Sequence, residues 1–224
     1  MIKNTFSKIL PRINIIFINQ ISSLITIPWI AFYFSKLTFG YIGISLIIIQ
    51  LGWLFINWIN LNYIFEKWNL LKGKKNKSKI VSDVISSQLF LLCFYLGIIF
   101  ILICIDFIII PFDYFFALLP SLIFGGLFPL WFFHVMNDSN KLVNITFISR
   151  AIFLIFTFVF INNDSKAILF LLFQGFSFFI ITFYCFYRIR FFYKYKFTLS
   201  SISNILFHIY NSTPFQLNSI VNNY

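Results

Sequence analysis

Long runs of apolar residues alternate with short polar segments along the whole chain. A helix needs about 20 apolar residues to cross the roughly 30 Å hydrocarbon layer of a bilayer, and each run approaches that length. Because open sheet edges and bare loops are not tolerated in lipid, these runs should be helices. The pattern predicts six transmembrane helices, at about residues 13–34, 41–65, 84–105, 114–135, 143–161 and 167–187.

A seventh stretch begins near Asn204 and reads ILFHIYNSTPFQLNSIVNNY, but polar residues and Pro214 interrupt it before Tyr224. We interpret it as the start of a further helix that is cut short. The sequence therefore predicts an all-α integral membrane protein, with a six-helix membrane lobe at residues 1–196 and the start of a truncated second lobe at residues 197–224.

The composition excludes a soluble domain. Hydrophobic residues make up 60% of the 224 residues, charged residues only 10%, and the mean hydropathy is +0.91. Soluble domains average about 25% charged residues, so this chain cannot cover itself with polar surface in water. The basic N-terminus superficially suggests a signal peptide, but the apolar run behind it is too long and lacks a small-residue cleavage site, so we interpret it as the first span.

The charges predict the direction of the helices. Most of the 17 Lys and Arg residues precede span one or follow spans two, four and six: Lys3, Lys8, Arg12, Lys67, Lys72, Lys74, Lys75, Lys77, Lys79, Lys141, Arg188, Arg190, Lys194 and Lys196. Cytoplasmic loops carry the excess of Lys and Arg, so we expect the N-terminus to be cytoplasmic. This orienting role is enough to explain the run KGKKNKSK; a nucleic-acid or anionic-lipid patch is the alternative.

Arg150, in NITFISRAIFLIF, is the residue that points most clearly to a functional site. It lies about seven residues into span five, which is ~10 Å from the cytoplasmic end at 1.5 Å per residue. A charge at mid-helix costs ~2.5–3.5 kcal/mol on insertion scales, so the side chain should face a cavity rather than lipid. Its planar guanidinium suits phosphate or carboxylate. The alternative is a side chain that snorkels to the cytoplasmic headgroups.

The first two spans also carry a set of amides: Asn14, Asn19, Gln20, Gln50, Asn57, Asn60 and Asn62. Asn57 and Asn60 are three residues apart and would share one helix face. Such amides can bind sugar hydroxyls, which would make Asn19, Asn57 and Asn60 substrate contacts. They can equally hydrogen bond across helices, which is the commoner use in membranes. Both interpretations stay open.

Prolines predict bent helices in spans one and four. Pro129 has no N–H and leaves the carbonyl of Gly125 without its helical partner, so a kink is expected there. Pro28 is a second candidate hinge. The segment FPLWFFHVMND then brings Trp131 to the cytoplasmic interface, where aromatic belts form. His134 would lie one turn from an aspartate, with which it could pair or relay a proton.

No motif for catalysis, metal or cofactor binding is present. The chain has six acidic residues and two histidines, without HExxH, GxSxG, a P-loop or paired intramembrane carboxylates. Asp106 and Asp113 flank a short outer loop, which is weak support for an acidic site. The three cysteines lie in apolar runs without a Cys or His partner, which favours reduced thiols. We therefore expect a protein that is not an enzyme and needs no cofactor.

Four stretches resemble the O-antigen and polysaccharide flippases (Wzx-type) of the multidrug/oligosaccharidyl-lipid/polysaccharide exporter superfamily. ISSLITIPWIAFYFSKLTFGYIGI resembles the family's first helix and the loop after it, and QLGW resembles its acidic-x-Gly-aromatic pattern with Gln50 in the acidic position. FPLWFFHVMND resembles a Pro-x-Trp-Phe-aromatic-Gln-Gly-x-Glu segment, with His134, Val135 and Asn137 replacing Gln, Gly and Glu. SISNILFHIYNSTPFQLNSI resembles the opening of helix seven. The matching residues are Pro28, Phe39, Gly40, Gly52, Trp53, Pro129, Trp131, Phe132 and Phe133.

The resemblance implies one of two lobes around a central cationic cavity. Such proteins move undecaprenyl-diphosphate-linked oligosaccharide across the bacterial inner membrane, and they are believed to be coupled to an ion gradient. By this likeness Arg150 would meet diphosphate or acidic sugar. The gate or hinge would involve Pro28, Pro129, Trp131 and His134. The expected partners are the lipid-linked oligosaccharide, the lipid bilayer, a polysaccharide polymerase and a chain-length regulator, and no nucleic acid.

The length of the chain leaves alternatives. One lobe cannot enclose a cavity between two lobes, so the chain is a truncated product or fragment, or it pairs with a second lobe. We expect truncation. An inactive fragment, a small-solute exporter of the same superfamily, and a membrane enzyme of polysaccharide assembly such as a polymerase or acyltransferase are the other interpretations.

Overall fold

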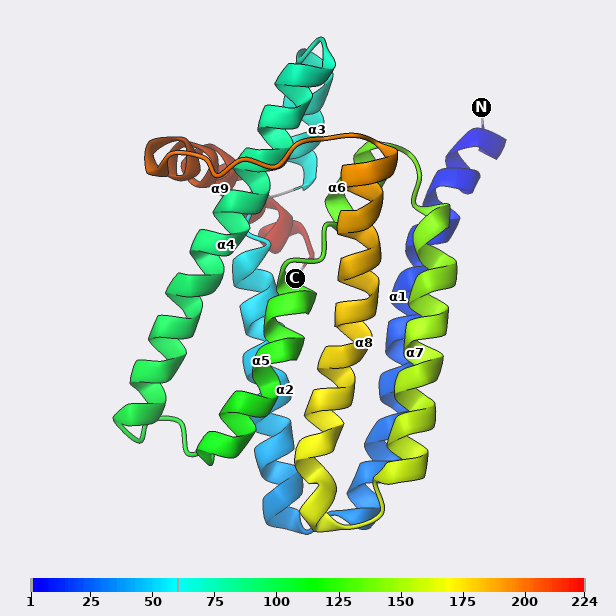
Figure 1. Ribbon diagram of the computed structural model, residues 1–224, viewed down its shortest axis with the longest axis vertical. Coiled ribbons are helices and arrows are strands. Elements are labelled where there is room, and N and C mark those ends of the chain that lie inside the picture. Colours follow the sequence, from blue (N-terminus) through cyan, green and yellow to red (C-terminus); the bar gives the residue numbers. More distant parts are fainter. Residues whose placement is uncertain (1, 60, 224) are drawn as a thin grey trace.

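The fold is helical throughout the part of the chain that the structure describes. The computed structural model describes residues 2–59 and 61–223, with side chains for 14–15, 17–59 and 61–218 (Figure 1). The helices are α1 (Ile2–Tyr33), α2 (Lys36–Ile56), α3 (Leu61–Leu70), α4 (Lys74–Cys104), α5 (Phe112–Gly126), α6 (Leu130–Val135), α7 (Asn140–Phe160), α8 (Ala167–Tyr187) and α9 (Ile202–Asn223). A 3-10 turn at Asp164–Lys166 (η1) precedes α8, and a π-helical turn at Arg188–Phe192 (η2) follows it.

Five helical segments of the described residues are long and apolar enough to cross a membrane: Lys36–Leu70, Lys74–Cys104, Phe112–Val135, Asn140–Phe160 and Asp164–Phe192. The apolar part of α1, Phe17–Tyr33, is shorter. The prediction of an all-α chain is therefore confirmed, and five or six of its helices are long and apolar enough to span a membrane, where the sequence predicts six. Two of the predicted helices are each divided in the structure. The predicted helix 41–65 is observed as α2 and α3, and the predicted helix 114–135 is observed as α5 and α6.

Each division has a local cause. The Asn57 side chain turns back on α2 and donates through Nδ2 to the carbonyl of Trp53 at 2.9 Å, which caps that helix. α5 ends at Gly126, three residues before Pro129, so the kink expected at this proline is a break between two helices. By contrast, α1 continues through Pro28.

Figure 1 shows α1, α2, α7 and α8 running along the long axis of the molecule, while α5 crosses obliquely and α4 leans away at one edge. The turn between α3 and α4 projects from one end, where the N-terminus and the α8–α9 connection also lie. We call this the basic end, because it gathers most of the loop lysines and arginines. At the opposite end, the Ser35 amide donates to Asp164 Oδ1 at 2.6 Å and the Trp29 indole donates to the carbonyl of Ile161 at 3.1 Å.

Two apolar clusters form the core. One lies among the long helices around Leu118 and Leu171, and the other lies toward the basic end around Phe132 and Phe133. α5 and α8 approach closely at Gly175, where an added Cβ would lie 2.5 Å from the Cβ of Pro120. Helix interfaces in membranes commonly use small residues in this way.

The connection from α8 to α9 is a non-helical segment, residues 194–201, that we call the strap; it crosses the face of α4 (Figure 1). Three serines of α4, spaced four residues apart, accept backbone N–H groups of alternate strap residues. The pairs are Ser78 with Lys196 at 3.0 Å, Ser82 with Thr198 at 3.1 Å, and Ser86 with Ser200 at 3.1 Å. We call these contacts the serine ladder.

After the strap, α9 packs against α3 and α4. The helix turns polar groups toward the bundle: Ser212 donates to the carbonyl of Trp58 at 3.1 Å, and the Trp58 indole donates to Thr213 Oγ1 at 3.1 Å. Leu206 and Tyr210 are exposed. α9 is not among the helices apolar enough to span a membrane. The interpretation of residues 197–224 as the start of a second lobe stays a prediction.

Candidate functional site

A cavity of about 330 Å³ lies among α1, α2, α5, α7 and α8. We call it the central cavity. Its apolar walls include several aromatic rings, and its polar lining comes from helices far apart in the sequence. The polar side chains are Asn19, Ser22, Ser23 and Thr26 of α1, Gln50 and Asn57 at α2, Thr146 and Arg150 of α7, and Gln174 of α8. A largely apolar cavity with a few convergent polar groups is the usual form of a small-ligand site.

Arg150 lies in this cavity, with only 6% of its surface exposed. Its Nε donates to Asn19 Oδ1 at 2.7 Å, which joins α7 to α1. The guanidinium carbon lies 4.1 Å from the centre of the Phe178 ring, a distance typical of a cation–π contact. The side chain therefore faces the interior of the bundle. The snorkelling alternative does not describe it.

The guanidinium has no carboxylate partner. All six acidic side chains lie in the described residues, and the ion pairs they form join Asp138 to Lys141 and Asp83 to His208. Asn19 is neutral, so it satisfies a hydrogen bond without neutralising the charge. Burying a charge without a paired counter-charge is energetically costly.

Two further polar groups of the cavity are not hydrogen bonded within the described residues. Thr146 Oγ1 and Gln174 Oε1 are both buried and have no partner there. Thr146 lies one turn before Arg150 on α7, and Gln174 lies one turn before Phe178 on the facing helix. Together with the guanidinium, they place a hydroxyl and an amide group in the polar lining of the cavity. Neither residue was singled out from the sequence, although the four-residue spacing of Thr146 and Arg150 was visible there.

Asn57 has a structural partner as well as a place at the cavity. Its Oδ1 accepts from Gln88 Nε2 at 2.8 Å, which joins the end of α2 to α4. This contact is the interhelical use that the sequence left open for these amides. Asn60, the third amide predicted to contact substrate, lies outside the described residues.

The segment after the helix break is packed inside the protein. Trp131 is only 7% exposed and packs in the apolar cluster of the basic end, so its ring contacts protein; its position at the membrane interface stays a prediction. Its neighbour Phe132 fills the space between Trp68 and Tyr195. The strap and α3 therefore cover this segment, which the sequence could not show.

His134 and Asp138 take partners from the loops around them. His134 Nδ1 lies 2.8 Å from Ser139 Oγ, and the Asp138 carboxylate accepts from Lys141 and Tyr193. Burial, with a contribution from the Asp138 carboxylate, raises the pKa of Tyr193 to about 12, so its hydroxyl stays protonated and donates. The roles of Pro28, Pro129, Trp131 and His134 as gate or hinge stay predictions.

A second polar cluster, which the sequence analysis missed, joins three helices at the basic end. His208 of α9 places Nε2 at 3.2 Å from Asp83 Oδ2 of α4 and Nδ1 at 2.8 Å from the hydroxyl of Tyr63 of α3. Ser200 of the strap donates to the other oxygen of Asp83. The Asp83 side chain is 4% exposed. The pair is separated by 125 residues, so no local pattern connected it.

Comparisons of this chain with protein-family models, with curated proteins and with solved structures find no match. Within the described residues, no group of three or more His, Cys, Asp or Glu side chains could hold a metal ion.

Proposed function

We propose that this chain is a multi-pass membrane protein of the bacterial inner membrane, with a cytoplasmic N-terminus, whose central cavity binds the anionic group of a lipid-linked oligosaccharide. It acts in moving that substrate between leaflets, as the N-terminal lobe of a flippase, and not as an enzyme. The substrate class expected is undecaprenyl-diphosphate-linked oligosaccharide. A polymerase and a chain-length regulator of polysaccharide assembly are the proposed protein partners.

The observation that carries the proposal is the buried charge of Arg150 without a carboxylate beside it. A mid-helix arginine costs ~2.5–3.5 kcal/mol on insertion scales, and a partner anion offsets that cost. The planar guanidinium binds phosphate oxygens in pairs, and its Nε is already fixed by Asn19, which leaves the two terminal nitrogens for a ligand.

The rest of the lining suits a molecule that is both charged and hydroxylated. Hydroxyl and amide groups from α1, α2, α7 and α8 surround the guanidinium, and neutral groups of this kind hydrogen bond to sugar hydroxyls. The aromatic ring of Phe178 beside Arg150 provides an apolar wall. Transport is supported by the break between α5 and α6, because two helices joined by an irregular segment can change angle at low cost.

The direct test measures binding of a soluble isoprenyl diphosphate to the purified chain in neutral detergent. Arg150→Gln keeps a donor for Asn19 but removes the charge. We expect this variant to bind at least about tenfold more weakly, since hydrogen bonds to charged groups contribute ~1.5–3 kcal/mol. Arg150→Lys, which keeps the charge but loses the planar donor set, should fall in between.

The matched control is Arg190→Gln, which removes an exposed arginine at the basic end. It should bind as the unchanged chain does. Equal affinity in the Arg150→Gln variant, with an unchanged melting temperature, would show that the cavity does not hold the anion and would overturn the proposal. Loss of surface polysaccharide in cells carrying Arg150→Ala would extend the result from binding to transport.

A further inference from the structure

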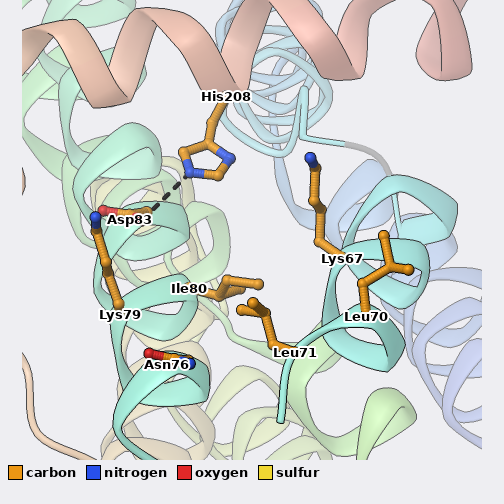
Figure 2. A pocket seen from close by; sticks show the side chains of 8 residues that line it. All are labelled: Lys67, Leu70, Leu71, Asn76, Lys79, Ile80, Asp83 and His208. Carbon is orange, nitrogen blue, oxygen red and sulfur yellow. Dashed lines mark hydrogen bonds and ion pairs between the residues drawn. The ribbon is translucent and has the colours of Figure 1, made fainter.

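A separate pocket of about 530 Å³ lies at the basic end, between the α3–α4 hairpin and α9 (Figure 2). Its volume is in the range of sites that bind small ligands, which is about 300–1,000 Å³. Lys67 enters from α3, Lys79 and Asp83 from α4, and His208 from α9. The apolar walls are formed by Leu70, Leu71 and Ile80, and Asn76 completes the lining.

The acidic group of this pocket is already engaged. Asp83 Oδ2 lies 3.2 Å from His208 Nε2, drawn as a dashed line in Figure 2, and Asp83 Oδ1 accepts from Ser200. With both oxygens bonded and the side chain 4% exposed, the carboxylate is the anchor of the strap and α9.

The two lysines of the pocket therefore lack a paired anion. Among the described residues, neither Lys67 nor Lys79 forms an ion pair with an acidic side chain. Lys67 Nζ lies 5.8 Å from the centre of the Tyr63 ring, and Lys77 Nζ, outside the pocket, lies 4.9 Å from the centre of the Trp68 ring. Two ammonium groups that line one pocket repel each other, and a bound phosphate with several charged oxygens can neutralise both.

The depth of the pocket indicates where such a phosphate comes from. Asp83 is the last charged residue of α4, and the predicted span 84–105 begins directly after it and runs toward the opposite end. In a chain that spans a bilayer, the hydrocarbon layer begins where such a span begins. The pocket is thus level with the lipid phosphates, where each lysine attracts anionic lipid.

We propose that this pocket binds the phosphate headgroup of an anionic phospholipid through Lys67 and Lys79. The site is distinct from the central cavity, and it depends on the proposed membrane insertion but not on Arg150. A headgroup held here contacts the α3–α4 hairpin beside the Asp83–His208 pair and so stabilises the packing of α9 against α4.

The test uses the purified full-length chain in neutral detergent, titrated with phosphatidylglycerol or with phosphatidylcholine of the same acyl chains. Lipid binding is measured by native mass spectrometry and by thermal stabilisation. We expect a preference for phosphatidylglycerol of about tenfold or more, which the double variant Lys67→Gln/Lys79→Gln abolishes. The matched control Lys72→Gln/Lys75→Gln removes two exposed lysines from the same hairpin and should change binding by about twofold or less.

Two outcomes would overturn the proposal. An equal loss in both double variants would mean that the hairpin attracts anionic lipid only by its total charge. Inorganic phosphate or glycerol phosphate that binds the unchanged chain as tightly as phosphatidylglycerol would mean that the source is a soluble phosphate. The Arg150→Gln variant should retain the phosphatidylglycerol preference, so failure of this site and failure of the central cavity are distinguishable.

Discussion

The Ser82 hydroxyl accepts the backbone N–H of Thr198 at 3.1 Å, across a separation of 116 residues. The same hydroxyl donates to the carbonyl of Lys196 at 3.2 Å. Ser82 is the middle serine of the serine ladder, and the regular pairing of these serines with strap residues has a geometric origin. Four residues of an α-helix rise about 6 Å, and two residues of an extended chain advance about 6.6 Å, so every fourth helical residue meets every second strap residue.

Replacing Ser82 by Ala should loosen the strap locally. The Thr198 amide loses its acceptor, and a hydrogen bond of ~1 kcal/mol corresponds to about fivefold faster exchange of that amide with solvent. Hydrogen exchange measured by mass spectrometry on peptides covering 194–201 checks this. Ser87→Ala is the control, because Ser87 Oγ donates to the Asp83 carbonyl within α4 and, among the described residues, not to the strap. Strap exchange that is the same in both variants would contradict the role of the ladder.

Asn19→Asp should separate stability from ligand binding. The new carboxylate would lie at hydrogen-bond distance from Arg150 and supply the missing counter-charge. We expect a higher melting temperature but at least about tenfold weaker binding of isoprenyl diphosphate, because the cavity is then neutral. Asn144→Asp, on an exposed position of the same helix as Arg150, adds the same charge elsewhere. A gain in anion affinity for Asn19→Asp would refute the electrostatic account of the cavity.

Gly175→Ala should destabilise the contact of α8 with α5. The added Cβ would lie 2.5 Å from Pro120 Cβ and 2.9 Å from the Ser121 nitrogen, and backbone cannot move aside as a flexible side chain does. Overpacking of this kind costs ~1–3 kcal/mol. Gly97→Ala in α4 meets no atom within 4 Å and should be neutral or stabilising by up to ~1 kcal/mol. Thermal unfolding of both variants provides the comparison, and equal stabilities would argue against the close helix contact.

Single cysteines should reveal the orientation. Asn76→Cys lies at the basic end and Ser165→Cys at the opposite end, in a chain with Cys93→Ser and Cys104→Ser and with the buried Cys185 retained. The excess of Lys and Arg predicts that a membrane-impermeant maleimide labels Ser165→Cys from the periplasmic side, and Asn76→Cys only after the membrane is opened. The reverse pattern would contradict a cytoplasmic N-terminus.

The all-helical fold and the approximate positions of the long apolar helices could be predicted from the sequence, because the length of an apolar run is a strong and local signal. A bend at Pro129 could be predicted for the same reason, since a missing N–H acts on the residues next to it, but the full break between α5 and α6 could not. The break after Ile56 could not, because the apolar run continues through it and the cause is a side-chain bond of Asn57.

Placement of Arg150 was open in the sequence, because a guanidinium seven residues into a span can turn inward or reach the headgroups. Only the position of α1, which brings Asn19 to Nε, decides it. The serine ladder and the Asp83–His208 pair were invisible for a different reason. Serines four residues apart have no meaning until a strap is known to cross them, and that crossing depends on contacts more than 110 residues apart.

Because every fourth residue of α4 has the same spacing as every second residue of the strap, the serine ladder can also form after the strap shifts along α4. A shift of the strap by two residues would restore serine acceptors for alternate amides and would carry α9 about 6 Å along α4. The serine hydroxyls alone would therefore allow more than one register of the strap on α4. Asp83 selects one of these registers. Its carboxylate contacts Ser200 and His208 at the same time in the observed register, and this pair of contacts fixes the position of the strap on α4.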